Sequence, residues 1–257
     1  MPGNDATWRD ARLEGTRFAD VRWFRTIDST NRYLLDEGAR GAVEGLVAVA
    51  DEQTVGRGRL GRAWVAPPRA SLLVSVLLRP RIAAERLGLV TMAAGLAAIE
   101  AVGRIAGINA RLKWPNDVVV DDRKLAGILA EKHDDAVVVG MGLNVHWESF
   151  PDDLAATATS CNLFGTGPAD RGDLLVAWLR ALDRRLHALD AIVDEARARS
   201  ATLGRSVRIE LPGESFTADA VALTAEGHLL VRDAAHREVT VTSADVVHLR
   251  PEDVRRT

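Results

Sequence analysis

The sequence has one cysteine, no excess of basic residues and no long apolar run, and each of these absences narrows the possible function. The single cysteine, Cys161, excludes an intrachain disulfide framework and fits a reducing compartment, so we expect a cytoplasmic protein. A formal net charge of -3 disfavours bulk nucleic-acid binding. The six histidines are scattered without ligand spacing, which predicts no built-in metal site. Apolar runs are interrupted by glycine and charge and no signal-peptide pattern is present, so we expect neither a membrane span nor a leader.

Lysine is also scarce, and its few positions are informative. Of the 33 basic residues only three are lysines, Lys113, Lys124 and Lys132, and all lie in one short stretch. A compact ammonium and a planar guanidinium are not equivalent at phosphates or in tight sites, so the retained lysines indicate a functional role for at least one of them. Chance survival in an arginine-biased composition is the alternative. Lys113 and Lys124 flank the Trp-Pro-Asn-Asp segment at residues 114–117, which favours the functional interpretation.

The hydrophobic pattern predicts three parts of the chain: a lead-in over residues 1–20, an α/β part over 21–203 and a small antiparallel barrel over 204–257. We expect a helix that starts at Asp28-Ser29-Thr30-Asn31, where capping residues precede an apolar pattern, and helices over 83–105 and 175–193. A loop is expected over 151–169. The expected strands cover residues 45–50, 71–78, 117–120, 124–130 and 136–145 and, in the barrel, 207–211, 216–224, 228–232 and 238–242.

Residues 56–62 read Gly-Arg-Gly-Arg-Leu-Gly-Arg, and we name them the glycine-arginine loop. Glycine loses the most backbone freedom on folding, so we expect little intrinsic order here. Three guanidiniums suit carboxylate or phosphate oxygens, and the following Trp64 offers a flat face for stacking. The stretch therefore predicts a mobile cationic loop that closes over an anionic ligand. A plain surface loop and an RNA-binding arginine-glycine segment are the alternatives; the P-loop and dinucleotide patterns are absent.

Further polar side chains that suit a ligand lie where strands are expected to begin or end. Asn116 and Asp117 precede a strand, although Asn-Asp is also ordinary turn chemistry. Lys124 opens a strand within apolar sequence, where its ammonium needs an anionic partner. Two glycines interrupt the strand expected at 136–145, which often marks the close approach of backbone or ligand. Asn144 ends that strand, either as a ligand contact or as a buried core amide.

The order and spacing of these motifs resemble the biotin protein ligase family. The resemblance rests on Ser29-Thr30-Asn31, on Gln53 with the glycine-arginine loop and Trp64, and on the segments 113–117, 124–129 and 140–144. It covers roughly residues 22–250, and several independent motifs agree in order. It implies an α/β (α+β) catalytic domain with a mixed β-sheet flanked by helices, of the class II aminoacyl-tRNA synthetase and biotin synthetase type. A small C-terminal SH3-like barrel is implied after it.

The resemblance also implies two overlapping sets of ligand contacts. Those for biotin are Ser29, Thr30, Asn31, Gln53, Arg57, Gly58, Arg59, Lys124 and Gly127. Those for the adenylate or ATP are Arg59, Arg62, Trp64, Asn116, Lys124 and Asn144. Lys124, Arg59 and Asp117 are the implied catalytic residues. This fits the chemistry, because a carboxylate and an α-phosphate must approach each other and preorganised cations stabilise the developing charge. Mg²⁺ is implied with ATP, without identified protein ligands.

The implied activity is a ligase that converts biotin and ATP to biotinyl-5'-AMP and then transfers biotin to one lysine of a carboxyl-carrier domain. The acceptor is implied to belong to an acyl-CoA or pyruvate carboxylase. No protein nucleophile is required, which agrees with Cys161, because no histidine lies near it in sequence. A lipoate–protein ligase and a non-enzymatic biotin-sensing regulator are the alternatives. The winged-helix module of some family members has no counterpart in this sequence, so we expect no DNA binding, no membrane association, and a monomer or weak homodimer.

Overall fold

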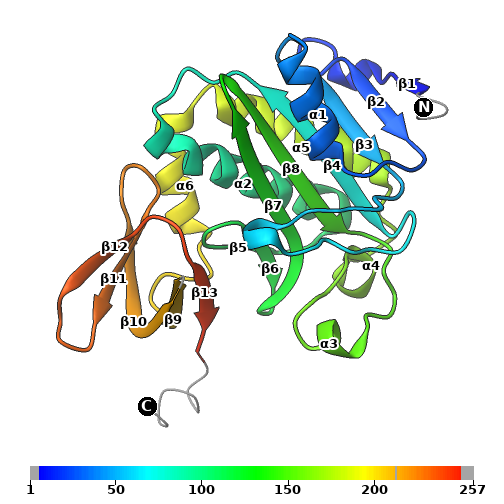
Figure 1. Cartoon of the computed structure of the whole chain (residues 1–257). Helices are drawn as coiled ribbons and strands as arrows, with labels where there is room; N and C mark the ends of the chain where they lie inside the picture. Colours follow the sequence, from blue (N-terminus) through cyan, green and yellow to red (C-terminus); the bar gives the residue numbers. More distant parts are fainter. Residues whose placement is uncertain (1–5, 212, 250–257) are drawn as a thin grey trace.

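The computed structural model describes residues 6–211 and 213–249, which form two sheets with helices around the larger one (Figure 1). The larger sheet has eight strands in the order β1 (Ala6–Trp8), β2 (Val21–Phe24), β3 (Val47–Ala50), β4 (Ser71–Leu78), β8 (Ala136–Asn144), β7 (Arg123–His133), β6 (Asp117–Val120) and β5 (Arg111–Lys113). Neighbouring strands are antiparallel, except that β2 and β3 are parallel. The predicted mixed sheet is confirmed.

Helices cover both faces of this sheet. The longer ones are α1 (Thr30–Ala39), α2 (Leu87–Ala106), α5 (Arg171–Leu186) and α6 (Ile192–Ala198). α1 packs on one face against β3, β4 and β8, whereas α2 packs on the other face, with α5 and α6 against it. In β4 the even-numbered positions 72–78 join the core under α2, while Leu73 and Leu77 join the core under α1. Because side chains alternate along a strand, Ser75 lies on the α1 face between them as a buried polar group.

Local sequence explains two elements that position the site. Ser29 caps α1, with its hydroxyl accepting from the backbone N–H of Arg32, so the predicted helix start is confirmed. Asp121 and Asp122 both have positive φ angles, 48° and 61°, and they turn the chain from β6 into β7. Asp tolerates the left-handed region better than most residues, and paired positive φ angles are typical of two-residue hairpin turns. This hairpin brings Asp117 and Lys124 onto neighbouring strands.

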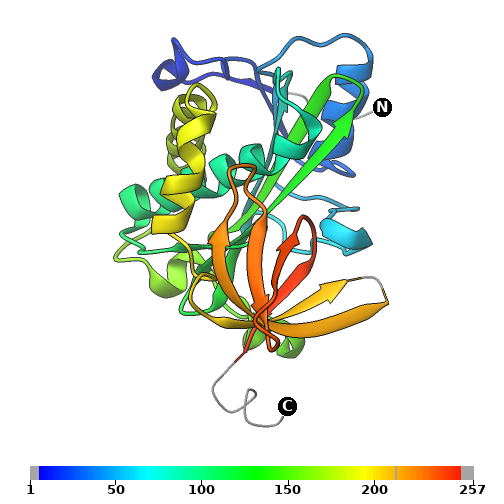
Figure 2. The ribbon, with the colours of Figure 1, turned by 90° about the vertical axis from the view of Figure 1, so that its left-hand side faces the viewer.

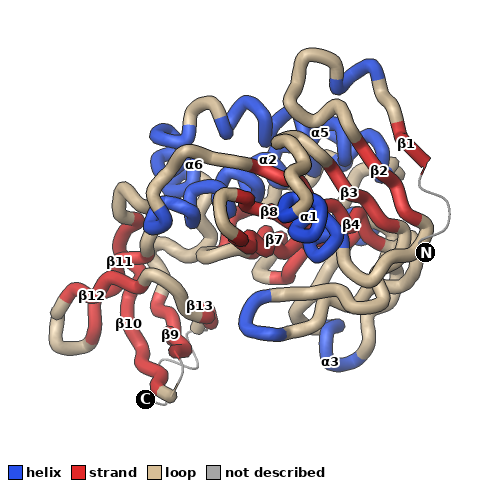
Figure 3. Tube along the Cα trace, turned by 45° about the horizontal axis from the view of Figure 1, so that its top comes forward, coloured by secondary structure: helices blue, strands red, loops and turns tan. Residues whose placement is uncertain are grey.

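The second sheet has five antiparallel strands and lies beside the first (Figure 2). Its order is β12 (Glu238–Val241), β11 (Leu229–Asp233), β10 (Glu214–Leu223), β9 (Ser206–Leu211) and β13 (Asp245–His248). The predicted small all-antiparallel C-terminal domain is confirmed. The sequence pattern missed β13, a short strand that pairs with β9. In Figure 3 the strands of this domain gather at one side of the main sheet.

The region expected as a lead-in is partly integrated into the main domain. β1 adds to the sheet next to β2, a short 3-10 helix follows at Ala11–Leu13, and Leu13 and Phe18 are buried. The expected helix over 175–193 is interrupted: α5 ends at Leu186, a 3-10 turn covers Leu189–Ala191, and α6 continues from Ile192. The apolar spacing persists across the break because both helices pack on α2.

Two further segments differ from the sequence-based expectations. The expected loop over 151–169 contains two single-turn helices, α3 (Asp152–Ala155) and α4 (Cys161–Phe164). β5 had no predicted counterpart, and its residues pair with β6. Elements this short contribute few apolar positions, so no periodicity marks them.

One helical stretch in the described part of the chain, Ala84–Ala106, is long and apolar enough to cross a membrane by length and composition, with a mean hydropathy of 1.6. In the folded protein, 72% of its most apolar part is buried. The stretch packs between the main sheet and α5, as the central helix of a folded core does.

Candidate active site

A cavity of about 410 Å³ lies over β7 and β8, between the start of α1, the glycine-arginine loop and β13. Every residue that the sequence singled out as a ligand contact or catalytic group lines it: Ser29, Thr30, Asn31, Gln53, Arg57, Gly58, Arg59, Arg62, Trp64, Asn116, Asp117, Lys124, Gly127 and Asn144. Tertiary structure therefore brings together segments that are more than a hundred residues apart. The assignment of each residue to one ligand or the other stays a prediction.

A chain of hydrogen bonds forms the wall of the cavity at the start of α1. The backbone N–H of Thr30 donates to Gln53 Oε1 at 2.8 Å, and the Thr30 hydroxyl lies 2.7 Å from Ser75 Oγ. Ser75 Oγ in turn donates to Asn31 Oδ1 at 2.6 Å. Thr30, Asn31 and Ser75 are all buried. A few fixed polar groups of this kind determine the orientation in which a small molecule binds.

The glycine-arginine loop and the two residues after it form a small hairpin, with residues 58–62 as its tip and residues 56–57 and 63–64 as its stem. Trp64 N–H donates to Gly56 O at 3.0 Å, and Gly58 N–H donates to Arg62 O at 2.7 Å. A side chain at Gly56 would place its Cβ 2.2 Å from Trp64 O, so the close pairing requires glycine there. These cross-strand bonds were not visible in the composition, which indicated little intrinsic order. The mobility of the loop stays a prediction.

The tip of this hairpin contacts the C-terminal domain. Arg59 donates to Asn116 Oδ1 at 3.2 Å and, on the other side, to Ser243 Oγ at 3.0 Å and the Ala244 carbonyl at 3.2 Å. Arg62 forms an ion pair with Asp245 on β13. Burial lowers the pKa of Arg59 below its usual value, but a guanidinium keeps its proton in proteins. The guanidiniums of Arg59 and Arg62 are thus held at the cavity by hydrogen bonds and one carboxylate, which a phosphate could replace.

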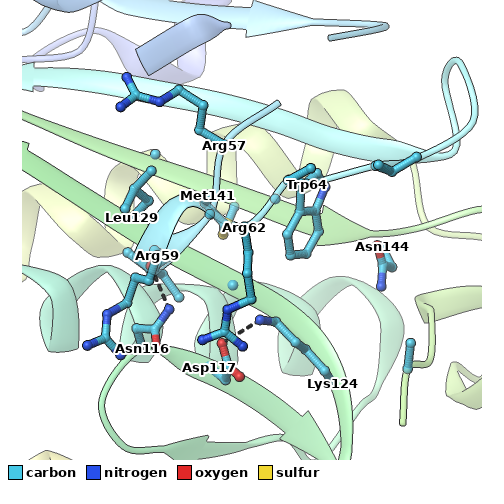
Figure 4. A pocket seen from close by; sticks show the side chains of 18 of the residues that line it. Arg57, Arg59, Arg62, Trp64, Asn116, Asp117, Lys124, Leu129, Met141 and Asn144 are labelled. Carbon is cyan, nitrogen blue, oxygen red and sulfur yellow. Dashed lines mark hydrogen bonds and ion pairs between the residues drawn. The ribbon is translucent and has the colours of Figure 1, made fainter. Parts of the chain in front are cut away.

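Lys124 and Asp117 form an ion pair in the cavity (Figure 4). Lys124 Nζ lies 2.7 Å from Asp117 Oδ1, a buried oxygen that has no aligned hydrogen-bond donor in the described structure. Nζ also lies 5.5 Å from the centre of the Trp64 ring. Burial lowers the pKa of the nearby Lys113, and the charge of Asp117 opposes this shift. Asp117 therefore compensates the positive charges of Lys113 and Lys124.

Glycines on β7 and β8 form the floor beneath Trp64. A Cβ on Gly142 would lie 2.3 Å from the indole, and one on Gly127 would lie 3.0 Å from it. A Cβ on Gly140 would lie 2.1 Å from Asn31 Oδ1. Backbone or ligand was expected to approach these glycines closely, whereas the groups that do so in the structure are side chains of the site itself. Trp64 Nε1 is buried against Gly142 and has no hydrogen-bond partner in the described structure.

The end of the cavity beyond β8 carries aromatic residues that the sequence analysis did not select. The rings of Trp147 and Phe150 lie 4.4 Å apart at an interplanar angle of 31°, and both line the cavity. Asn144 is 3% exposed and donates from Nδ2 to Thr159 O at 2.9 Å. Asn144 is thus a bonded core amide that also lines the cavity. Aromatic residues just after the strand end were the available signal for this part of the site.

Other lining residues could not be found from local sequence. The C-terminal domain contributes Glu210, Asp245, Val246 and Val247, although the sequence indicated no site in that domain. Ser75 was hidden within an apolar strand. Within the residues that the structure describes, no group of three or more histidine, cysteine, aspartate or glutamate side chains could hold a metal ion.

Cys161, which was not expected to act as a nucleophile, and Trp178 on α5 are both buried. Cys161 is fully buried, which raises the pKa of its thiol to about 12, so it is not a thiolate at neutral pH. Trp178 is fully buried and donates to the Ala94 carbonyl at 3.0 Å. Neither residue lines the cavity.

The cavity lies at the junction of a mixed sheet and a small antiparallel domain, and its polar wall, aromatic end and several cations suit a small polar ligand bound together with an anion. Models of two families match the chain: the biotin/lipoate A/B protein ligase family over residues 23–146, and the biotin protein ligase C-terminal domain over 202–249. The chain belongs to the biotin protein ligase family.

Individual relatives agree with this assignment. The biotin–[acetyl-CoA-carboxylase] ligase of Mycobacterium tuberculosis is 40% identical over 232 residues, which cover 86% of each chain. The bifunctional ligase/repressor BirA of Bacillus spizizenii is 30% identical over 217 residues, 80% of this chain and 67% of that protein. The structure of the Aquifex aeolicus biotin protein ligase in complex with biotin and ATP is similar with a TM-score of 0.80 and 28% identity, over 90% of this chain and 98% of that one.

Proposed function

We propose that this protein activates biotin with ATP and transfers it to a lysine of a biotin carboxyl-carrier domain. The observation that supports this most directly is the Lys124 ammonium, which shares one cavity with the polar wall at α1 and with Arg59 and Arg62. The 40% identical relative is a biotin–[acetyl-CoA-carboxylase] ligase, which favours the carrier domain of an acyl-CoA carboxylase as the acceptor.

In the first step a biotin carboxylate oxygen attacks the α-phosphorus of ATP. An oxygen–phosphorus bond forms to that carboxylate, the bond to the bridging oxygen breaks, and pyrophosphate leaves. Lys124 lowers the repulsion between the two anions and stabilises the negative charge on the α-phosphate oxygens. For this its ammonium must move from Asp117 toward the phosphate. Arg59 and Arg62 give up their contacts with the C-terminal domain and bind the adenylate instead.

In the second step the lysine amine of the carrier domain attacks the acyl carbon of biotinyl-5'-AMP. A carbon–nitrogen bond forms, the bond from carbon to the phosphate oxygen breaks, and AMP leaves while the amine loses a proton. AMP is a good leaving group, so the protein needs no nucleophile, in agreement with the buried thiol of Cys161. The contacts of Arg59 and Arg62 with the adenylate hold it in the cavity until the acceptor arrives.

Mg²⁺ is expected to enter with ATP. Mg²⁺ prefers oxygen ligands and is usually bound by one or two carboxylates together with substrate phosphates. Asp117, whose carboxylate Lys124 would leave as it moves to the phosphate, and the neighbouring Asn116 would supply such oxygen ligands. When bound, the ion supplies charge neutralisation of the phosphates. A cytoplasmic location, a monomeric or weakly dimeric state and the absence of DNA binding stay predictions.

Biotin-dependent exchange of pyrophosphate into ATP tests the proposal. We expect exchange with biotin and not with lipoate, followed by labelling of a carrier domain. The lipoate arm is needed because the matching family model covers both biotin and lipoate ligases. Exchange with lipoate alone would favour the lipoate alternative, and binding of biotin without exchange would favour a regulator.

A further inference from the structure

Glu131 on β7 connects the hairpin of the glycine-arginine loop to the wall of the cavity. One carboxylate oxygen, Oε1, lies 2.9 Å from Arg57 Nη2, and the other, Oε2, accepts from Asn31 Nδ2 at 2.8 Å. The Glu131 side chain is 19% exposed, whereas that of Arg57 is 47% exposed. Glu131 itself does not line the cavity. It therefore acts on the site through two residues that do.

On the α1 side, the contact extends the hydrogen-bond chain of the polar wall. The Asn31 amide is fully engaged: Nδ2 donates to Glu131 and, at 3.3 Å, to the Leu129 carbonyl, while Oδ1 accepts from Ser75. Glu131 thus fixes the orientation of Asn31. Asn31 in turn is hydrogen-bonded to Ser75, and Ser75 to Thr30, so Glu131 also restrains these two residues of the cavity wall.

On the hairpin side, Glu131 anchors the stem rather than the tip. Arg57 lies opposite Ala63 in a β-bridge, so a hold on Arg57 restrains both strands of the hairpin and Trp64 at its end. Figure 4 shows the Arg57 side chain directed away from the side on which Arg59 and Arg62 point toward Asn116 and Asp117. A phosphate that replaces Asp245 at the tip leaves the contact of Arg57 with Glu131 in place.

The energetics favour a closed hairpin. If Arg57 moved away, Glu131 would keep a largely buried carboxylate with Asn31 as its remaining partner, and an incompletely compensated buried charge is costly. We propose that Glu131 is a positioning residue that couples closure of the hairpin to the polar wall, and so slows the escape of biotin and its adenylate. This inference rests on the proposed biotin ligase function.

A double-mutant cycle tests it. Glu131→Gln keeps an oxygen acceptor for Asn31 but removes the charge that holds Arg57, and Arg57→Met removes the cation but keeps the stem. We expect each variant to increase the dissociation rate of radiolabelled biotin about tenfold, with a smaller effect on kcat of pyrophosphate exchange. The double variant should dissociate no faster than the more affected single variant, because both remove the same contact.

Glu238→Gln provides the matched control. Glu238 pairs with Arg232 in the C-terminal domain, and neither residue lines the cavity. The Arg232 side chain is about as exposed as that of Arg57. Biotin should therefore dissociate from Glu238→Gln at the wild-type rate. Arg57 is half-exposed, so Arg57→Met should fold normally. An unchanged dissociation rate of biotin in this variant overturns the inference. Additive effects of the two substitutions in the double variant overturn it as well. A wild-type protein that does not bind biotin overturns the proposed function instead, and the two failures are therefore distinguishable.

Discussion

Arg62 in the glycine-arginine loop forms an ion pair with Asp245, which lies 183 residues further along the chain on β13. The tip of the loop is therefore held by the C-terminal domain. We expect an anionic ligand in the cavity to compete with Asp245 for this guanidinium. The small domain is thus a part of the site rather than an appendage.

This relationship predicts that Asp245→Asn loosens the unliganded loop. Limited trypsin digestion should cleave after Arg59 and Arg62 several times faster in the variant, because the charge that holds the tip is lost. Biotin with ATP should protect the loop in both proteins, since ligand contacts offset the ordering entropy. Equal cleavage of both unliganded proteins would show that β13 does not restrain the tip.

Replacement of Lys124 should abolish adenylate formation without unfolding the protein. Loss of one preorganised charge contact costs about 10²- to 10³-fold in rate, so Lys124→Ala should lose at least that much pyrophosphate exchange. Lys124→Arg should rescue poorly, because a planar fork does not match a compact ammonium. Lys132→Ala, at the other end of the same strand and outside the cavity, is the control. Near-normal exchange in Lys124→Ala would refute the catalytic assignment.

Arg59→Gly should weaken retention of the adenylate more than its formation. A charge-assisted hydrogen bond contributes about 1.5–3 kcal/mol, and its loss appears mainly in the dissociation rate. Escaped biotinyl-5'-AMP would label albumin added to the reaction, which a biotin blot detects. Arg81→Gly, an exposed residue outside the cavity, should label albumin no more than wild type does. If Arg59→Gly behaves the same way, retention depends on Arg57 or Arg62.

Stability should depend on pH through His248. Its side chain is 6% exposed and lies 3.1 Å from Thr202 Oγ1 and 3.4 Å from Asp122 Oδ1. Burial, together with the nearby charges of Lys113 and Arg205, lowers the pKa of His248 from 6.5 to about 4, although Asp122 opposes the shift.

Between these two values the unfolded chain binds a proton that the native protein does not, so the free energy of unfolding should fall as the pH falls from 6.5 to 4. Denaturant unfolding of His248→Gln should show a weaker decrease over this range, whereas His146→Gln, at an exposed position, should retain the wild-type decrease. An identical pH dependence in His248→Gln would exclude the buried histidine as its source.

Most of the main fold could be predicted because it depends on strong local periodicity. The strand predicted over 71–78 matches β4, and the strands at 117–120 and 136–145 match β6 and β8 to within one residue. The missed strands, β1, β2, β5 and β13, are three or four residues long and form only because a neighbouring strand offers backbone partners. The break between α5 and α6 was missed because both segments continue the same apolar spacing.

The sequence by itself selected, through the order and spacing of its motifs, the residues predicted to bind the ligands, and all of them line one cavity. Only the tertiary structure decided what those residues contact within the protein: Lys124 contacts Asp117, Trp64 contacts Gly142, Arg62 contacts Asp245 and Arg57 contacts Glu131. The last two partners lie 183 and 74 positions away from their arginines along the chain. An ion pair between such distant residues leaves no local periodicity, because it depends on how the sheet and the small domain are placed together.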